Sequence, residues 1–229
     1  MVGPETRVMT IQNGIEAPYQ VAEVVPPDRV IVGIMAGGGN MTAPGVIRRP
    51  QGGPVSYDSY IGQLAPEKAG RTENVARVQA VLLEAGWPSV VPDDIRVSAW
   101  SKFSWWVPHT GVAALCRVPV GVWRSIPESR ALLPRATEEA VKVAHAQGVV
   151  LANALEYQDH LTDTLPPAGR PTSAALDILN GRPSELDATV GAVIRLGKEA
   201  GVPTPVNEFI YAALLPQELK ARGQIAWPE

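Results

Sequence analysis

The sequence predicts an α/β part followed by an all-α helical part, within a chain of 229 residues. Short runs rich in Val and Ile and bounded by turn residues are typical of buried strands, and these runs lie in the first ninety or so residues. Beyond Asp93 the strand pattern fades, and longer segments carry apolar residues at helical spacing. We therefore expect two domains, over residues 1–92 and 93–229.

The first part contains strand candidates and one clear amphipathic helix. The strand candidates are "RVMTI" at 7–11, "RVIVGIM" at 29–35, "GVIRRP" at 45–50 and "VSYDSYIG" at 55–62. The segment "TENVARVQAVLLEAGW" at 72–87 then changes to the helical period. Its apolar side consists of Val75, Val78, Val81, Leu82 and Ala85.

Helical periodicity dominates the second part of the chain. The segments that we expect to be helical are 94–115, 127–147, 150–163, 172–180, 184–200 and 205–222. Pro166, Pro167, Gly169 and Pro171 form a turn-rich connection within this part, because Pro and Gly interrupt helices.

The helix expected over 184–200 has recognisable signals at both ends. Ser184 stands at the start, with Asp187 three residues later as in a capping box. Gly201 and the prolines that follow it end the helix. Leu186, Val190, Val193, Ile194 and Gly197 follow at helical spacing and form the expected buried stripe.

The composition is that of an ordinary globular protein and excludes several classes. Apolar residues make up 45% and charged residues 19% of the chain, and the net charge is -3, so a nucleic-acid partner is not expected. The single cysteine excludes an intrachain disulfide and a cysteine-rich metal site. The sequence shows neither a signal-peptide pattern nor an apolar run of about 18 residues. We expect no membrane span and a cytoplasmic location.

Lys102 is a candidate for acid–base chemistry because it lies in the aromatic stretch "SAWSKFSWWVPHTG". An ammonium group partly removed from water by aromatic walls should have a lowered pKa, which suits a general acid near neutral pH. The alternative is a lysine whose stem crosses apolar surface or whose charge stacks on a Trp ring. The residues alone leave both interpretations open.

Glu185 and Ser173 have the same ambiguity. A glutamate in the first helical turn is favoured by the helix macrodipole, and a Ser at the start of "SAALDIL" is typical of an N-cap. The functional alternative places both side chains at a cleft between the domains.

The remaining candidates carry weaker signals. His109, His145 and His160 show no metal-ligand spacing; we interpret the last two as helix-surface residues and keep His109 as a weak site candidate. The glycine run at 37–39 could approach a phosphate, although such a run is also typical of a loose turn. Neither GxGxxG nor GxxxxGK[ST] occurs in the chain.

Taken together, these residues resemble one family, the ketopantoate reductases, also called 2-dehydropantoate 2-reductases. The similarity lies in "QNG" at 12–14, W-x-K at 100–102, "TS" at 172–173, "GRPSELD" at 181–187 and "GVPTPVN" at 201–207. The resemblance implies a remnant of a Rossmann-type NADP-binding domain followed by a helical domain similar to the C-terminal domain of 6-phosphogluconate dehydrogenase. It also implies NADPH-dependent reduction of a 2-oxo acid.

The resemblance assigns roles to individual residues. Lys102 matches the lysine that donates a proton to the ketone oxygen while hydride arrives from the nicotinamide. Asn13 matches an asparagine near the cofactor. Ser173 matches a substrate-binding serine, and Glu185 matches a glutamate close to both cofactor and substrate. The role implied for Lys102 agrees with the chemistry of the reaction, because a carbonyl that accepts hydride develops alkoxide charge that a nearby cation stabilises.

Two departures from the family pattern change what we expect. Trp106, Thr110 and Val120 stand where the family usually has asparagines that hold the substrate. Of these, Thr110 is kept as a substrate-binding candidate. Because hydrogen-bonding capacity is lost there, we expect a bulkier or more apolar carbonyl compound than ketopantoate.

The second departure is that the family's initial βαβ unit with GxGxxG has no counterpart in this sequence. We therefore expect a truncated or incomplete chain, in which Gly39 and Asn13 remain as cofactor-binding candidates.

The resemblance thus implies an NADPH-dependent 2-oxo acid reductase whose partner is a small-molecule carbonyl substrate, and a homodimer is among the assemblies that we consider. A non-catalytic helical module that binds a ligand or dimerises stays open as the alternative. Missing phosphate-binding glycines favour that module, whereas retention of Lys102, Ser173 and Glu185 together favours the enzyme.

Overall fold

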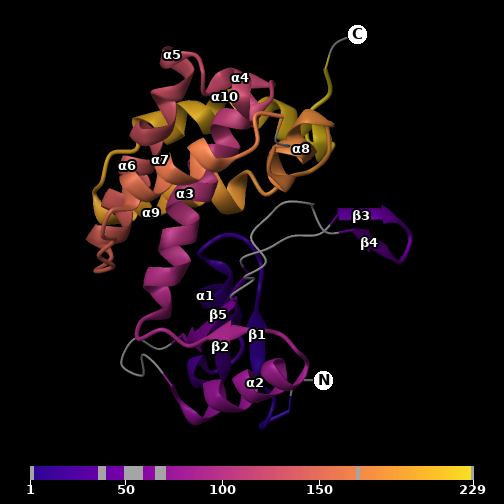
Figure 1. The fold of residues 1–229 in the computed structure, drawn as a ribbon, viewed down its shortest axis with the longest axis vertical. Helices are drawn as coiled ribbons and strands as arrows, with labels where there is room; N and C mark the ends of the chain where they lie inside the picture. Colours follow the sequence, from indigo (N-terminus) through magenta and orange to yellow (C-terminus); the bar gives the residue numbers. More distant parts are fainter. Residues whose placement is uncertain (1–2, 36–39, 49–58, 65–70, 169–170, 228–229) are drawn as a thin grey trace. The chain divides into compact units, whose positions relative to one another are not determined.

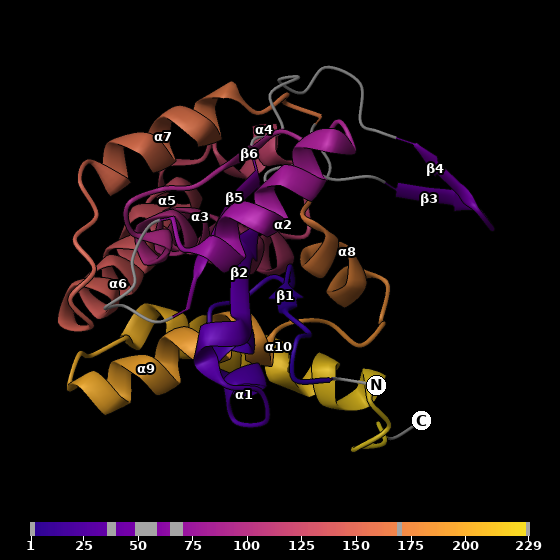
Figure 2. The same cartoon turned by 90° about the horizontal axis from the view of Figure 1, so that it is seen from below.

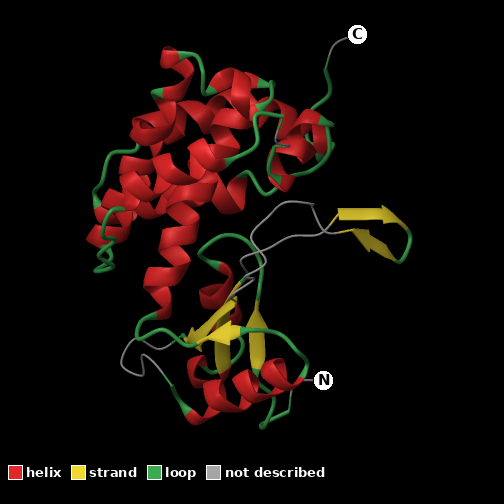
Figure 3. Ribbon diagram, viewed as in Figure 1, coloured by secondary structure: helices red, strands yellow, loops and turns green. Residues whose placement is uncertain are grey.

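The computed structural model describes residues 3–35, 40–48, 59–64, 71–168 and 171–227. These residues form two compact units. Unit 1 comprises Met1–Gln12 and Ala17–Ser98, and unit 2 comprises Asn13–Glu16 and Ala99–Glu229. Figure 3 shows that the described strands all belong to unit 1, whereas the described part of unit 2 consists of helices and loops.

Unit 1 is built on a small mixed sheet. Its strands are β1 (Val8–Thr10), β2 (Val30–Ile34), β5 (Ser59–Gln63) and β6 (Ser89–Val90), and they lie in the order β1-β2-β5-β6. β1 pairs with β2 in parallel and β5 pairs with β6 in parallel, whereas β2 and β5 are antiparallel. β1, β2 and β5 overlap strand candidates of the sequence, whereas β6 was not expected.

Both faces of this sheet are covered, because successive strand residues point to opposite sides. On one face Val30 and Val32 pack with Ile95, beside α1 (Ala17–Ala22). On the other face Ile31 and Ile61 pack with Val75 of α2 (Glu73–Glu84). α2 and the sheet are visible in the lower part of Figure 1.

The predicted apolar side of α2 is only partly buried. Val75 is fully buried and Val78 and Leu82 pack against it, but Val81 is 65% exposed. Gln79 is buried instead and donates from Nε2 to the Ser89 carbonyl oxygen at 2.9 Å. The sheet edge next to α2 is therefore held partly by a polar contact that periodicity does not reveal.

A separate two-stranded ribbon completes the described part of unit 1. It consists of β3 (Asn40–Ala43) and β4 (Val46–Arg48), which are antiparallel. Gly45 at its turn has a φ of +75°, a conformation that glycine adopts without strain. A short 3₁₀ turn, Pro27–Arg29, precedes β2.

Unit 2 contains the helices of the second part. They are α3 (Ile95–Cys116, from Ala99 onward), α4 (Val120–Trp123), α5 (Pro127–Arg130), α6 (Leu132–Ala146), α7 (Ala154–Thr164), α8 (Ser173–Leu179), α9 (Ala192–Ala200) and α10 (Pro205–Ala221). A π-helical turn, η3 (Asp187–Gly191), leads directly into α9. The helices expected from periodicity are confirmed, most with boundaries that differ by a few residues. The helix expected over 184–200 is instead η3 followed by α9, and α4 and the break between α5 and α6 were not expected.

Close helix crossings in unit 2 depend on glycine. A Cβ atom at Gly111 of α3 would lie 2.7 Å from Cγ2 of Ile210, so α3 and α10 approach at this point. A Cβ atom at Gly197 of α9 would lie 2.8 Å from Cγ2 of Thr204. Figure 2 shows α9 beside α6, and the predicted stripe residue Val193 is fully buried. Packing of this density leaves no room for larger side chains.

The predicted Ser184–Asp187 capping box is wrong. The Ser184 hydroxyl accepts from the Leu186 backbone N–H at 3.1 Å and donates to Glu218 Oε2 at 2.6 Å. Asp187 instead accepts from Arg195 Nη1 at 2.9 Å and from the Tyr211 hydroxyl at 3.1 Å. A buried carboxylate from α10, distant in sequence, therefore takes the place that local spacing gave to Asp187.

Candidate active site

Three of the predicted site residues meet within unit 2. Lys102 Nζ donates to Asn13 Oδ1 at 3.1 Å, and Asn13 Nδ2 donates to Glu185 Oε2 at 3.1 Å. Lys102 comes from α3, Asn13 from the turn after β1, and Glu185 from the segment before η3. All three side chains are half-buried. Residues separated by up to 172 positions thus form one hydrogen-bonded row.

The chemistry of this row fixes the orientation of the Asn13 amide. An ammonium group only donates and a carboxylate only accepts, so the carbonyl oxygen must face Lys102 and the NH₂ group must face Glu185. Asn13 therefore separates a cation from an anion. Lys102 and Glu185 do not form a direct ion pair in the described structure.

Burial dominates the electrostatics of Lys102. Removal from water lowers the pKa of its ammonium group, and the negative charge of Glu185 opposes this by raising it. The predicted direction of the lysine pKa is therefore confirmed. A lysine of this kind holds a proton that it can release more readily than an exposed lysine does.

The turn that carries Asn13 is fitted closely to η3. Gly14 has a φ of +100°, and a Cβ atom there would lie 2.9 Å from the Ala188 carbonyl oxygen. Two residues further on, Glu16 forms an ion pair of 2.7 Å with Arg195. The "QNG" turn needs its glycine both for the positive φ and for this close approach.

The segment that carries Glu185 is held by a buried network. Glu218, which is 4% exposed, accepts from the Ser184 backbone N–H at 3.0 and 3.1 Å. Arg222 Nε donates to Glu218 Oε1 at 2.7 Å, and the Thr189 hydroxyl donates to the Glu185 carbonyl oxygen at 2.6 Å. The backbone on both sides of Glu185 is thereby fixed.

Lys102, Trp106 and Thr110 lie on the same face of α3, because they are spaced by four residues. The Thr110 hydroxyl lies 2.8 Å from the Trp106 carbonyl oxygen and 2.8 Å from the Thr172 hydroxyl. Since Thr110 has one hydroxyl proton and gives it to Trp106, Thr172 must donate to Thr110. The Thr110 side chain is buried, with 2% of its surface exposed. Its hydroxyl proton is already used in the hydrogen bond to the Trp106 carbonyl oxygen.

Ser173 is the first residue of α8, but it is not the N-cap. Thr172 caps the helix, and its hydroxyl accepts from the Ala175 backbone N–H at 3.3 Å. The N-cap interpretation of Ser173 is therefore wrong, and its exposed side chain is available for other contacts. The contact between Thr172 and Thr110 brings the start of α8 to the α3 face that carries Lys102.

The other sequence candidates lie elsewhere. His109 is buried between the Trp105 and Trp123 rings, each with its centroid 5.5 Å from the His109 ring, and Val120 is buried at the start of α4. His145 and His160 are exposed, as expected. Gly39 and its glycine run lie outside the described residues. Within the described parts of the chain, no cluster of three metal-ligating side chains occurs.

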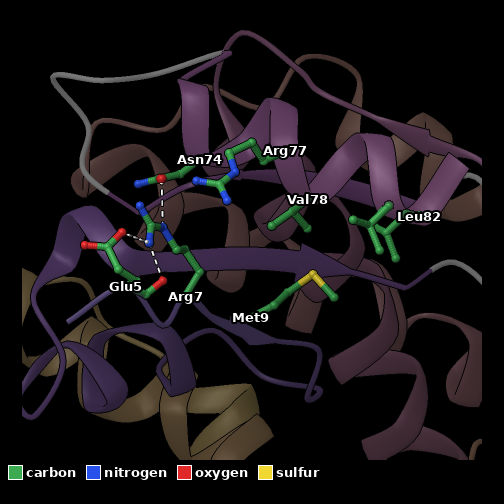
Figure 4. Close-up of a pocket in the computed structure, with 8 residues that line it drawn as sticks. Glu5, Arg7, Met9, Asn74, Arg77, Val78 and Leu82 are labelled. Carbon is green, nitrogen blue, oxygen red and sulfur yellow. Dashed lines mark hydrogen bonds and ion pairs between the residues drawn. The ribbon is translucent and has the colours of Figure 1, made fainter. Parts of the chain in front are cut away.

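Unit 1 carries a groove between β1 and α2 with a volume of about 370 Å³. Figure 4 shows Arg7, Glu5 and Asn74 at one end and Met9 and Leu82 at the other. Arg7 donates from Nε to Asn74 Oδ1 at 2.8 Å and pairs with Glu5. The wall of the groove is mainly apolar, and none of the predicted site residues lines the groove.

Sequence reasoning missed Glu16, Arg195 and Glu218. Glu16 and Arg195 are separated by 179 positions and Ser184 and Glu218 by 34, so no local spacing relates them. The sequence marks them only as charged residues in particular places. Glu16 lies close to the "QNG" turn, and Arg195 and Glu218 lie within predicted helices.

The described helices include none long and apolar enough to cross a membrane.

Comparison with known proteins gives consistent matches along the chain. The family model described as "Ketopantoate reductase PanE/ApbA C terminal" matches residues 94–218, and that described as "Ketopantoate reductase PanE/ApbA" matches residues 1–62. A 2-dehydropantoate 2-reductase of Halobacterium salinarum is 29% identical over 199 residues, which cover 87% of this chain and 63% of that protein.

Solved structures show the same fold. The crystal structure of 2-dehydropantoate 2-reductase from Methylococcus capsulatus is 27% identical with a TM-score of 0.82, and the match covers 96% of this chain and 68% of that chain. A D-mandelate dehydrogenase with NADH and anilino(oxo)acetate also has a TM-score of 0.82, at 20% identity, with 97% and 70% covered. The chain thus spans 63–70% of the length of these three proteins.

Proposed function

We propose that this chain, which belongs to the ketopantoate reductase family, carries the proton-donating site of a reductase that converts a 2-oxo acid to the 2-hydroxy acid. The observation that carries the proposal is the row formed by Lys102, Asn13 and Glu185. Reductase relatives, together with this arrangement, favour the enzyme over a non-catalytic helical module.

Lys102 acts as the general acid in this proposal. When the carbonyl carbon of the substrate accepts hydride, its oxygen becomes an alkoxide that needs a proton. The Lys102 ammonium group stabilises this negative charge and then donates the proton from Nζ, which leaves a neutral amine. The pKa of Lys102, lowered by burial, makes this donation easier than from an exposed lysine.

The residues of the site fit the nicotinamide end of a dinucleotide cofactor. Asn13 gives one Nδ2 proton to Glu185 and keeps a second N–H that an amide carbonyl could accept. When bound, the nicotinamide supplies the hydride, and we propose NADPH as the carrier. The 229 residues contain no GxGxxG turn, and Gly39 stays the proposed phosphate-side contact of the cofactor in this chain.

Ser173, Glu185 and Thr110 are the proposed substrate contacts. Ser173 has an exposed hydroxyl at the start of α8, and Glu185 has a second carboxylate oxygen besides the one that accepts from Asn13. Thr110 can contribute only as an acceptor, because its proton is given to Trp106. Substrate binding therefore relies more on Ser173 than on Thr110.

The proposed substrate has a bulky or apolar side chain. Trp106 lies one helical turn from Lys102 on the same face of α3, and Val120 is buried. An indole and an isopropyl group cannot replace the hydrogen bonds that two amide side chains would make to a small polar acid. The Trp106 indole, on the face of α3 that carries Lys102, suits an aliphatic or aromatic substituent.

The test is turnover of a panel of 2-oxo acids with NADPH and, separately, NADH. The purified 229-residue chain and the longest in-frame product of its gene are assayed in parallel, with cofactor binding measured by calorimetry. We expect reduction of an apolar 2-oxo acid with higher kcat/KM than ketopantoate. Family-like turnover of ketopantoate would contradict the substrate class, and no cofactor binding by either protein would contradict the reductase.

A further inference from the structure

Arg195 binds residues of two of the three chain segments that supply the site, the turn after β1 and the segment that leads into η3. From α9 it donates Nε to Glu16 Oε1 at 3.3 Å and Nη2 to Glu16 Oε2 at 2.7 Å. The same guanidinium donates Nη1 to Asp187 Oδ1 at 2.9 Å and Nη2 to the Asp187 carbonyl oxygen at 3.0 Å. A guanidinium is a rigid plane of five N–H groups, so two partners bound to one plane are held in a fixed relation.

The partners of Arg195 stand next to the site residues in sequence. Glu16 follows Asn13 by three residues, and Asp187 follows Glu185 by two. The Asn13–Gly14 turn and η3 also touch through their backbones, because Gly14 approaches the Ala188 carbonyl oxygen. The two segments are therefore joined at one end by Arg195 and at the other by the hydrogen bond between Asn13 and Glu185.

We propose that Arg195 is a positioning residue, which clamps the Asn13–Glu16 turn against residues 185–188 so that the Asn13 amide stays between Lys102 and Glu185. The role of this clamp in catalysis rests on the function proposed above. Its structural part does not, because it concerns only contacts within the free protein. Arg195 forms no hydrogen bond or ion pair with Lys102 or Glu185 in the described structure and acts through Asn13.

If Arg195 clamps the turn, its loss should change the pKa of Lys102, which the loss of a purely structural ion pair would not do. If the turn is released, the Asn13 amide no longer separates Lys102 from Glu185, and the carboxylate can pair directly with the ammonium group. Glu185 is the charged side chain whose field acts on Lys102. Direct pairing of opposite charges stabilises the ammonium form and raises the lysine pKa.

The experiment measures the protonation of Lys102 without substrate or cofactor. Lysine side chains are labelled with ¹³C at the ε position, and the NMR shift of Lys102 is followed against pH; its signal is assigned by its loss in Lys102→Arg. In Arg195→Lys the positive charge remains but the two-partner geometry is lost. We expect the Lys102 midpoint to rise by about one pH unit.

Glu16→Ala tests the same clamp from the other side. Removing a negative charge should by itself lower the lysine midpoint slightly, so an upward shift in this variant can only come from released positioning. The double variant should shift the midpoint no further than either single change, since both remove one interaction. An additive shift, or a downward shift in Glu16→Ala, would contradict the proposal.

Arg130→Lys is the matched control. Arg130 is 35% exposed, close to the 40% of Arg195, and it also binds one carboxylate with two N–H groups, at 2.6 and 3.2 Å to Asp163. It should leave the Lys102 midpoint unchanged. If Arg195→Lys lowers the melting temperature but leaves the midpoint unchanged, Arg195 is only structural. If the midpoint shifts and no 2-oxo acid is reduced, the positioning role holds and the proposed function fails.

Discussion

The Lys102 ammonium group donates to the Asn13 amide oxygen at 3.1 Å, and no carboxylate pairs with it directly in the described structure. A cation that is half-buried and bound by a neutral acceptor is poised to lose its proton. A direct carboxylate partner would hold the proton more firmly. This relationship determines which substitutions should affect catalysis.

Replacing Lys102 should remove proton donation. We expect Lys102→Ala to lower kcat by about 10²- to 10⁴-fold, and Lys102→Arg to fail similarly because a guanidinium keeps its proton. In the natural protein kcat should fall as the pH rises through the lysine pKa, below the ordinary value of 10.5. Steady-state kinetics across pH check this, and an active Lys102→Arg variant would exclude the lysine as acid.

His109 should make the protein sensitive to acid. Burial lowers its pKa to about 4 from 6.5, so between these values the unfolded chain binds more protons than the folded one. The contribution of His109 to the free energy of unfolding should therefore be fully present above pH 6.5. It should be lost as the pH drops towards 4, which lowers the free energy of unfolding by about 3 kcal/mol. Urea unfolding at several pH values measures it.

The matched variants for this prediction are His109→Leu and His160→Gln. His109→Leu fills the space between the Trp rings with an apolar side chain that does not titrate. The acid-dependent loss of stability should therefore shrink. His160 is exposed on α7, and its replacement should leave the loss unchanged. An unaltered pH dependence in His109→Leu would show that other groups control acid unfolding.

Gly14→Ala should damage the turn that carries Asn13. Both the positive φ and the close approach to the Ala188 carbonyl oxygen oppose a Cβ atom, and we expect a loss of about 2–3 kcal/mol. Gly201→Ala is the control, because Gly201 has a φ of +69° with open space around it. Its loss should be about 1 kcal/mol, the cost of a Cβ atom in the left-handed conformation alone. Equal losses in the two variants would mean that the contact with Ala188 contributes nothing.

Glu218→Gln should destabilise the segment before η3. Its buried carboxylate accepts from the Ser184 backbone N–H and hydroxyl and from Arg222, and an amide can satisfy only part of this set. We expect a loss of about 1–3 kcal/mol in thermal or urea unfolding. Glu138→Gln, which breaks an exposed pair with Lys142, should change stability by less than about 0.5 kcal/mol.

Sequence patterns predicted the helices of unit 2 well because their apolar stripes record local periodicity. Leu186, Val190 and Val193 are all buried, and Gly201 ends α9 in the left-handed conformation. The same periodicity suggested that Val81 shares the apolar side of α2, although it is largely exposed. Periodicity locates a face of a helix but not how much of it another element covers.

The sequence proposed the members of the candidate site but not the contacts between them. Lys102, Asn13 and Glu185 were assigned through the family resemblance, and the structure places them in one row. That Asn13 separates the two charges, and that Arg195 joins two segments, could not be predicted, because both depend on residues far apart in sequence. Local signals even favoured a wrong partner for Ser184, since a buried acceptor on α10 competes better than nearby Asp187.

The membership of Asn13–Glu16 in unit 2 has a practical consequence for making fragments of this protein. A recombinant piece that starts at residue 93 would keep every long helix from α3 to α10, and with them Lys102 and Glu185. It would lack the short turn that supplies the amide between them and Glu16, one of the two acids that bind Arg195. Such a piece could fold and still be chemically different at its lysine, so the helical region cannot be studied faithfully by cutting the chain once.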